Sequence, residues 1–408
     1  MRIGLTRRIQ RRRGFLVAVG GALAIVALGL GQAWLENSVG VGSGIVRAQS
    51  VEAPMFEVDP FWPRPLPNHW LLGSAIGVGI DAQDHVWIVH RGSVETLGAN
   101  EIPASLDPPI AEMCCVPAPP VLEFDTDGNV VGSWGGPGEG YTWPTSNHGI
   151  TIDHMDNVWI GGNGQGDSHV LKFTRDGQFL LEVGEPGHDV DSNSTTHYSR
   201  VAKISIDAAE NEAYLADGYG NRRVAVVDMT TGALRRFWGA YGNTPDDSDF
   251  GRYDPTAPPP QQFASPVHCA EVSHDGLVYV CDRAQDRIQV FQKDGTFVNE
   301  VFIARTTLGS GSMWDLTFSH DEEQRYIYAV DGVNEKVYVI ERESLNLLTS
   351  FGDGGRQTGA FYGVHSIATD SAGNIYTTET YEGKRLQKFV YKGIGAVPRE
   401  QGLAWPSN

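Results

Sequence analysis

Short segments of alternating apolar and polar residues recur along the chain and predict β-hairpins. The clearest runs from His148 to Asp153 (HGITID) and is followed, after a polar turn, by the apolar run 157–160 (NVWI). Period-two alternation, a turn, and then β-branched and aromatic residues are typical of two paired strands. Five further copies begin at Ile76, Ala202, His268, Trp314 and His365. The chain is therefore predicted to repeat one β-rich unit six times.

The spacing of the copies indicates how many strands each unit holds. The last three copies start 46 and 51 residues apart, which is room for four strands and tight turns. Six units of four strands are the signature of a β-propeller. The sixth copy ends after its third strand, near 386–390, so we expect the segment around Phe56 to supply its outer strand. The prediction is an all-β, six-bladed β-propeller over residues 49–408, formed as one domain and closed by an N-terminal strand.

Three of the units share a second pattern, in which an acidic residue ends one strand and a basic residue opens the next. It occurs at 217–224, 282–288 and 331–337. The pattern resembles the NHL repeat, which occurs in propellers of many functions and therefore indicates the fold and not the chemistry. The first unit also carries a proline-rich insertion, 93–120, which we expect to form a loop over one face.

Net charge narrows the choice of partners. It is −19 for the whole chain and −25 without residues 1–48, which hold seven arginines and one glutamate. Such a charge repels nucleic-acid phosphates and anionic membrane surfaces. We therefore expect no nucleic-acid partner, and contact with a membrane only through an uncleaved N-terminal segment.

The N-terminal segment 1–48 has the pattern of an export signal. Residues 2–13 are basic, residues 15–30 are almost wholly apolar, and Val46 to Ala48 is a plausible cleavage site. Arg12 and Arg13, followed by Gly-Phe-Leu, resemble the core of a twin-arginine signal. The alternative is a permanent membrane anchor formed by residues 15–35. In both cases the remaining chain is expected outside the cytoplasm, in the periplasm or the extracellular space.

Four cysteines in an exported chain suggest disulfides. Cys269 and Cys281 flank a turn and would lie opposite each other in the predicted hairpin. They form either a cross-strand disulfide or two separate small core residues. Cys114 and Cys115, inside the insertion, are consistent with a vicinal disulfide, free thiols or an intermolecular bond, and the sequence does not rank these.

Histidine occupies the same register in alternate units, at His148, His268 and His365. The innermost strand of each propeller blade lines the central channel, so equivalent positions lie at one depth. A lone histidine in a strand is usually a core or surface residue. Three imidazoles a third of a turn apart, however, would form an open zinc site with one position left for water or substrate.

The ends of the second strands are expected near the mouth of the same channel. They carry Arg91, Asn163, Asp217, Asp282, Asp331 and Glu379. Arg91 either pairs with a neighbouring acid or holds a substrate carboxylate. Tyr219 follows Asp217 by two residues, which would let its phenol face the metal.

These residues together resemble the peptidyl-α-hydroxyglycine α-amidating lyases, six-bladed NHL propellers with zinc in the channel. The resemblance covers about residues 55–392. It is carried by the segments GVGIDAQDHVWIVHRG (77–92), HGITID (148–153), ADGYGNRRV (216–224), PVHCAEV with CDRAQDRIQVF (266–291) and VHSIATD (364–370).

The resemblance implies a role for each candidate site residue. The zinc ligands of the family fall on His148, His268 and His365, and its active-site arginine falls on Arg91. Its catalytic tyrosine falls on Tyr219, and a second ligand-contacting arginine falls on Arg283.

The resemblance also implies a structural calcium ion. It would be held by the backbone carbonyls of Val78 and Ile150 and by an aspartate directly after the last zinc ligand. This chain has Ser366 at that position. Because a hydroxyl is a poorer calcium ligand than a carboxylate, the implied calcium site is weakened.

The function implied is that of a zinc-dependent lyase that cleaves the C–N bond of an α-hydroxy amide. Its substrate would be small or peptide-derived, and its products an amide and glyoxylate or a similar acid. One alternative is a secreted NHL propeller that binds a protein or glycan without catalysis. Another is a calcium-dependent, lactonase-like hydrolase whose ligands come from Asn163, Asp217, Asp282 and Glu379.

Overall fold

The computed structural model describes residues 50–93 and 95–406. The predicted export or anchor segment, 1–48, lies outside these ranges. The chain divides into Met1–Ser50 and a compact unit, Val51–Asn408. Within the described ranges, no helix is long and apolar enough to span a membrane.

Six four-stranded antiparallel sheets make up the compact unit, and each predicted copy opens one of them. Blade 1 comprises β3 (Ser74–Ile80), β4 (Val86–Arg91), β6 (Val121–Phe124) and β7 (Val130–Trp134). Blade 2 comprises β8 (Asn147–Ile152), β9 (Val158–Gly162), β10 (His169–Phe173) and β11 (Phe179–Gly184). Blade 3 comprises β12 (Val201–Asp207), β13 (Glu212–Asp217), β14 (Arg223–Asp228) and β15 (Leu234–Trp238).

The second half of the chain supplies the other three blades. Blade 4 comprises β16 (Val267–Val272), β17 (Leu277–Asp282), β18 (Arg287–Gln292) and β19 (Phe297–Phe302). Blade 5 comprises β20 (Asp315–Phe318), β21 (Tyr326–Asp331), β22 (Lys336–Glu341) and β23 (Asn346–Phe351). Blade 6 comprises β24 (Val364–Thr369), β25 (Ile375–Glu379), β26 (Arg385–Val397) and β1 (Val51–Val58).

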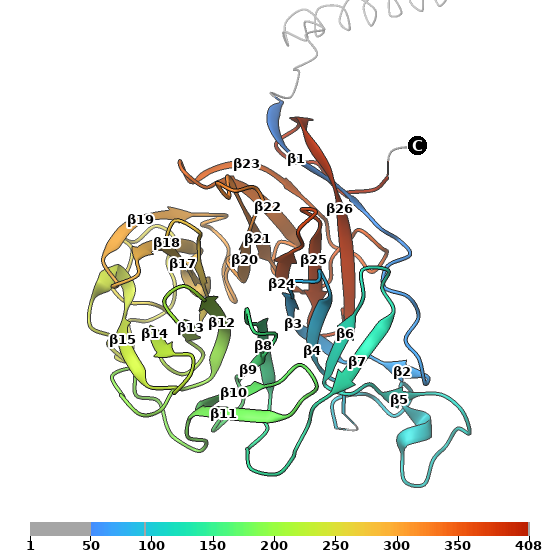
Figure 1. The fold of residues 1–408 in the computed structure, drawn as a ribbon. Coiled ribbons are helices and arrows are strands. Elements are labelled where there is room, and N and C mark those ends of the chain that lie inside the picture. The colour runs from blue at the N-terminus through green and yellow to red at the C-terminus, as the bar shows by residue number, and fades with distance from the viewer. Residues whose placement is uncertain (1–49, 94, 407–408) are drawn as a thin grey trace, which may run out of the picture. The chain divides into compact units, whose positions relative to one another are not determined.

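The blades close into a ring around their innermost strands. Each innermost strand contacts the next, from β3 through β8, β12, β16 and β20 to β24, and β24 contacts β3 again. Figure 1 shows these strands gathered at the centre, with the outer strands at the rim. The predicted six-bladed propeller is therefore confirmed.

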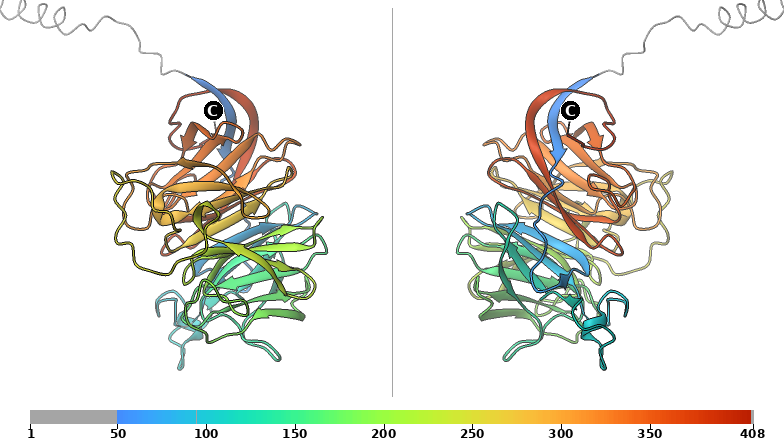
Figure 2. Two further views of the ribbon diagram at one scale, coloured as in Figure 1. Left: turned by 90° about the vertical axis from the view of Figure 1, so that its left-hand side faces the viewer. Right: turned by 90° about the vertical axis from the view of Figure 1, so that its right-hand side faces the viewer.

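The N-terminal strand closes the ring, as predicted. β1 pairs antiparallel with β26 as the outermost strand of blade 6, with Phe56 opposite Tyr391. Figure 2 shows the blue strand β1 beside the red strand β26. The Phe56 ring packs on Tyr328 and Phe351 of blade 5, so the closing strand joins two blades.

The aspartate that ends four of the six repeats has a local structural role. In blade 2, Asp153 accepts hydrogen bonds from the backbone N–H of Met155 and Asn157, and from the indole N–H of Trp159. One carboxylate thus closes the turn and fixes a buried tryptophan in the next strand. Asp81 and Trp87 repeat the arrangement in blade 1. The repeated pattern therefore encodes the hairpin between the first and second strands of a blade.

The 93–120 insertion is largely irregular, as expected, but it is tied to the propeller. It contains the short 3₁₀ helix η1 (Pro103–Ser105) and strand β5 (Val116–Pro117), which pairs in parallel with β2 (Trp70–Leu71). Ile102 is fully buried, and Glu101 pairs with Lys384 at 2.8 Å. Two further 3₁₀ helices are η2 (Ala240–Gly242) and η3 (Arg283–Gln285).

All four cysteines form disulfides. Cys269 and Cys281 are directly opposed across β16 and β17, as the hairpin register predicted, and are bonded to each other. Cys114 and Cys115 form a vicinal disulfide in the insertion, which selects one of the three possibilities left open by the sequence.

Candidate metal centre and catalytic groups

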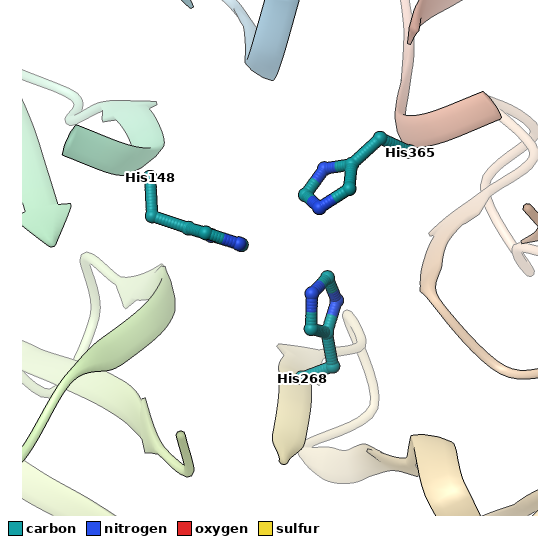
Figure 3. Close-up of side chains that lie close together, drawn as sticks. All are labelled: His148, His268 and His365. Atoms are coloured by element: carbon teal, nitrogen blue, oxygen red, sulfur yellow. The ribbon is translucent and has the colours of Figure 1, made fainter. Parts of the chain in front are cut away.

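The three histidines converge on one point of the channel. Each is the second residue of the innermost strand of its blade: His148 in β8, His268 in β16 and His365 in β24. Their ring centroids lie 4.8 to 5.0 Å apart, so the rings form a nearly equilateral triangle. Figure 3 shows the three rings turned toward a common centre. They are also one of the two groups in the described residues whose side-chain ligand atoms all lie within 4.8 Å of one another.

A carbonyl oxygen from the neighbouring blade orients each ring. The Nδ1 of His148 donates to Ala202 O at 2.7 Å, and that of His365 donates to Ile76 O at 2.7 Å. The Nδ1 of His268 donates to Trp314 O. The three acceptors are the first residues of the third, first and fifth repeats, so they hold the same register as the histidines. The alternation in the sequence thus has a physical counterpart: even blades supply rings and odd blades supply the carbonyls that orient them.

The environment keeps all three imidazoles neutral. Burial lowers the pKa of His148 and of His268 well below the ordinary value, and it lowers the pKa of His365 to about 3. Because Nδ1 carries the proton of each ring, Nε2 presents a lone pair to the channel. Three neutral imidazoles with oriented second nitrogens fit a zinc ion with one open position.

Tyr219 lies over the open side of the triad. Its hydroxyl oxygen is 3.1 Å from Nε2 of His148 and 2.9 Å from Nε2 of His268. Two flanking glycines make this approach possible. A Cβ on Gly218 would lie 2.0 Å from Val267 O, and one on Gly220 would lie 1.9 Å from Ser199 Oγ. The Gly-Tyr-Gly segment is therefore needed for the tyrosine to reach the channel.

Arg283, at the start of η3, lies against the same tyrosine. Its Nη1 donates to the Tyr219 hydroxyl oxygen at 3.0 Å, which stabilises negative charge on that oxygen. Its guanidinium lies 5.4 Å from the centre of the Tyr219 ring and 4.7 Å from that of Trp314. Its Nε is buried without a hydrogen-bond partner within the described residues, which leaves a donor for a ligand.

Arg91, the last residue of β4, binds neutral groups. Its Nε donates to Asn147 O at 3.0 Å, and its Nη2 donates to Asn163 Oδ1 at 2.7 Å. Within the described ranges Arg91 forms no ion pair, so the alternative of direct pairing with an acid is not found, although burial lowers its pKa and the charge of Asp167 acts to raise it. The charge of Arg91 helps to lower the pKa of His148, where burial and the charge of His365 have larger effects. Arg91 therefore lies near the triad. The cation thus remains available for an anionic substrate group.

The acids at the ends of the second strands do not form a calcium site. Asp217, Asp282 and Glu379 are fully buried, and each pairs with an arginine of its own blade: Arg223, Arg287 and Arg385. Asp331 accepts hydrogen bonds from Asn334 and Tyr338. The acid and base of the NHL-like pattern thus pair within blades 3 and 4, while Asp331 is held by neutral groups. The ligand set of a lactonase-like hydrolase is not assembled.

The residues implied for calcium also fail to fit that ion. The Ser366 hydroxyl donates to Asp315 Oδ2 at 2.6 Å. The other oxygen of this carboxylate is 2.7 Å from Nζ of Lys203. An ammonium group, rather than an open cation site, faces the acid beside the predicted position.

A second group of possible metal ligands is already neutralised. Asp81, His85 and Glu123 lie together, but Arg175 contacts both carboxylates. His85 is half-buried, and its Nδ1 is 2.6 Å from Glu123 Oε1.

Trp314 is the site residue whose role the sequence did not reveal. Its carbonyl orients His268, and its buried ring packs on Arg283 and, at 5.5 Å between centroids, on His365. Its position in the sequence could have indicated this role, because Trp314 is the first residue of the fifth repeat and shares the register of the histidines.

The chain is similar in sequence to a lyase and to NHL-repeat proteins. No protein-family model matches it. It is 24% identical over 359 residues to peptidyl-alpha-hydroxyglycine alpha-amidating lyase 1 of Drosophila melanogaster, covering 82% of this chain and 59% of the fly protein. It is 24% identical over 250 residues to NHL repeat-containing protein 3 of Mus musculus, covering 60% and 58%. The chain therefore spans less than two thirds of both relatives, and the resemblance inferred from sequence is confirmed.

Two solved structures are similar in fold. A protein of unknown function from Bacteroides thetaiotaomicron superposes with a TM-score of 0.50 at 12% identity, over 83% of this chain and 77% of that one. A virginiamycin B lyase from Staphylococcus aureus gives 0.46 at 13% identity, over 85% and 89%.

Proposed function

We propose that the protein is an exported, zinc-dependent lyase that cleaves the C–N bond of an α-hydroxy amide. The observation that carries the proposal is the Tyr219 hydroxyl, which contacts Nε2 of His148 and His268 and accepts a hydrogen bond from Arg283. A phenol held at the open side of three neutral imidazoles, with an arginine beside it, suits removal of a proton from a bound hydroxyl.

The contacts of each residue suggest its role in the proposed reaction. His148, His268 and His365 would hold zinc, which as a Lewis acid lowers the pKa of a substrate hydroxyl. Arg91, which forms no ion pair with any described residue, binds the substrate carboxylate. Tyr219 takes the hydroxyl proton, and the electrons of the O–H bond form the new carbonyl as the C–N bond breaks. The departing nitrogen takes the proton, so an α-hydroxyglycine gives an amide and glyoxylate.

Export is part of the proposal and has separate support. Two disulfides suit an oxidising compartment, either periplasmic or extracellular. The basic and apolar pattern of residues 1–48 agrees with this location.

The test is turnover of an N-acyl-α-hydroxyglycine by the purified protein, followed as glyoxylate released. We expect Tyr219→Phe to lose activity by a factor on the order of 10²–10⁴, because one proton-transfer group is removed. Its bound metal should remain, because the three imidazoles are unchanged. Tyr391→Phe is the matched control, since this tyrosine lies on the outer strand β26 and should keep full activity.

Two results would refute the lyase. One is no glyoxylate from the metal-loaded wild type with any of several N-acyl groups. The other is equal turnover by wild type and Tyr219→Phe. Either result would favour the alternative of a propeller that binds a protein or glycan without catalysis.

A further inference from the structure

A largely buried lysine, with 12% of its side chain exposed, lies beside the histidine triad. Lys203 follows Ala202, whose carbonyl orients His148, on the innermost strand β12. Its Nζ lies 2.7 Å from Asp315 Oδ1 and 3.0 Å from Glu271 Oε1. Asp315 opens β20 and Glu271 lies on β16, so one ammonium group connects the innermost strands of blades 3, 4 and 5.

The Asp315 carboxylate extends the connection to blade 6. Its Oδ2 accepts hydrogen bonds from the Ser366 hydroxyl at 2.6 Å and from the Ile367 N–H at 3.1 Å. Ser366 directly follows the metal-ligand candidate His365. The position of β24 at the triad is thus linked through Asp315 to the charge on Lys203.

One buried carboxylate, Asp315, and one partly buried carboxylate, Glu271, share this position and require a positive charge. Desolvation of an unpaired carboxylate is costly, and a neighbouring second carboxylate adds repulsion. Burial lowers the pKa of Lys203, but Asp315 and Glu271 outweigh burial and raise it above the ordinary value. The lysine is therefore a charged ammonium group.

Space in the channel is limited on the side of the triad. The cavity lined by the three histidines, Lys203, Asp315 and Ser366 has a volume of about 10 Å³. That is about the room for one water molecule. A larger cavity of about 280 Å³, lined by Val78, Ile150 and Glu271, also borders Lys203. The lysine side chain therefore borders both the small cavity at the triad and this larger one.

We propose that the Lys203 ammonium is the permanent cation of this part of the channel and replaces the calcium ion implied by the resemblance. Ser366 and Asp315 form with it a charged cluster that holds β24 without a second metal ion. The protein then needs one metal, at the histidines, for an ordered channel. This inference concerns charge inside the channel and does not depend on the proposed reaction.

The test removes the ammonium group and asks whether calcium takes its place. Lys203→Ala leaves Asp315 and Glu271 unpaired beside an empty volume, where oxygen ligands favour calcium. We expect this variant to unfold at a lower temperature than the wild type. Added calcium should raise its unfolding temperature by about 5 °C. The wild type should bind no calcium, and its unfolding temperature should not respond to the ion.

A matched control separates this effect from the general loss of a buried lysine. Lys172 is also buried and pairs with a single carboxylate, Asp153, at 3.2 Å. Lys172→Ala should be destabilised without recovery in calcium. All proteins are loaded with zinc beforehand, and calcium content is measured by mass spectrometry after gel filtration in calcium-free buffer.

Two outcomes would overturn the proposal. One is wild-type protein that retains stoichiometric calcium or is stabilised by it, a result that needs no variant to fold. The other is a folded Lys203→Ala protein, or Lys203→Gln if the alanine variant does not fold, that responds to calcium no more than Lys172→Ala.

Discussion

At the scale of single residues, main-chain oxygens determine the state of the triad. Each imidazole donates through Nδ1 to a carbonyl of the next blade, so no acidic side chain shares the proton. A neutral carbonyl fixes the ring without adding negative charge near the metal position. Arg91 and Arg283 are nearby cations that lower the pKa of His148, after the larger effects of burial and His365. Burial lowers the pKa of His365 most, and the charge of Lys203 contributes to the same shift. The site is therefore built to receive an anionic ligand.

Asp286 gives a test of pH dependence at this scale. It is fully buried, its Oδ1 accepts the Ser312 N–H at 2.8 Å, and its Oδ2 has no hydrogen-bond partner within the described residues. Burial raises its pKa to about 7. A folded-state pKa above the unfolded value of 3.8 means that its contribution to stability is complete below about pH 4 and is lost as pH rises through about 7.

Asp286→Asn should therefore stabilise the protein more at pH 8 than at pH 5. The expected gain in the free energy of unfolding at pH 8 is on the order of 1–2 kcal/mol, because the amide is never charged. Urea unfolding at the two pH values measures it. Asp156→Asn is the control. Asp156 (φ +60°), like Asp286 (φ +55°), has a left-handed backbone conformation, but it lies nearer the surface. A gain that is equal at both pH values would contradict the account.

At the scale of strands and blades, the NHL-like pattern encodes a buried ion pair in blade 3 and another in blade 4. Arg223 opens β14 and Asp217 ends β13, and the two are fully buried with Nε 2.8 Å from Oδ2. The remaining donors of the guanidinium bind the carbonyls of Ser192, Ser194 and His197. One arginine thus joins two strands to the loop that precedes the blade.

Arg223→Met should lower the free energy of unfolding by about 3–5 kcal/mol, because it leaves a buried carboxylate unpaired. Arg325→Met is the control: Arg325 pairs with Asp321 at 3.2 Å on the surface, where such pairs contribute about 0–1 kcal/mol. Denaturant unfolding of both variants measures the difference. Equal effects of the two substitutions would show that the pattern has no special structural role.

The repeats could be predicted because a strand and its register follow from local alternation. The first position of each repeat lies on the innermost strand, or directly before it at Trp314. For this reason the convergence of the three histidines could be predicted. The direction of a side chain at a strand end is not set by that alternation, so Asp217 was expected near the channel mouth but turns into its blade. Contacts between distant segments also escape the pattern. Arg175 reaches Glu123, and Lys203 reaches Asp315, across blade boundaries that only packing defines.

At the scale of the whole molecule, ring closure and the channel support each other. Pairing of β1 with β26 completes blade 6, and the contact of β24 with β3 returns the ring to its start. A histidine from blade 6 meets histidines from blades 2 and 4 only when this ring is closed. The arrangement of the candidate metal centre therefore depends on the assembly of all six blades, since each odd blade supplies a carbonyl and each even blade a ring.

The most direct test of the central claim is the metal content of the purified protein, determined by mass spectrometry after zinc loading. The account predicts about one zinc per chain in the wild type, as for a site of three histidines, and its loss in His268→Ala. His169→Ala is the control. This buried histidine of β10 forms no hydrogen bond with the triad, and its Nε2 is hydrogen-bonded to Thr142 O at 2.7 Å. It should retain the metal. A wild type without bound zinc, or a His268→Ala protein that binds as much as the control, would contradict the metal centre.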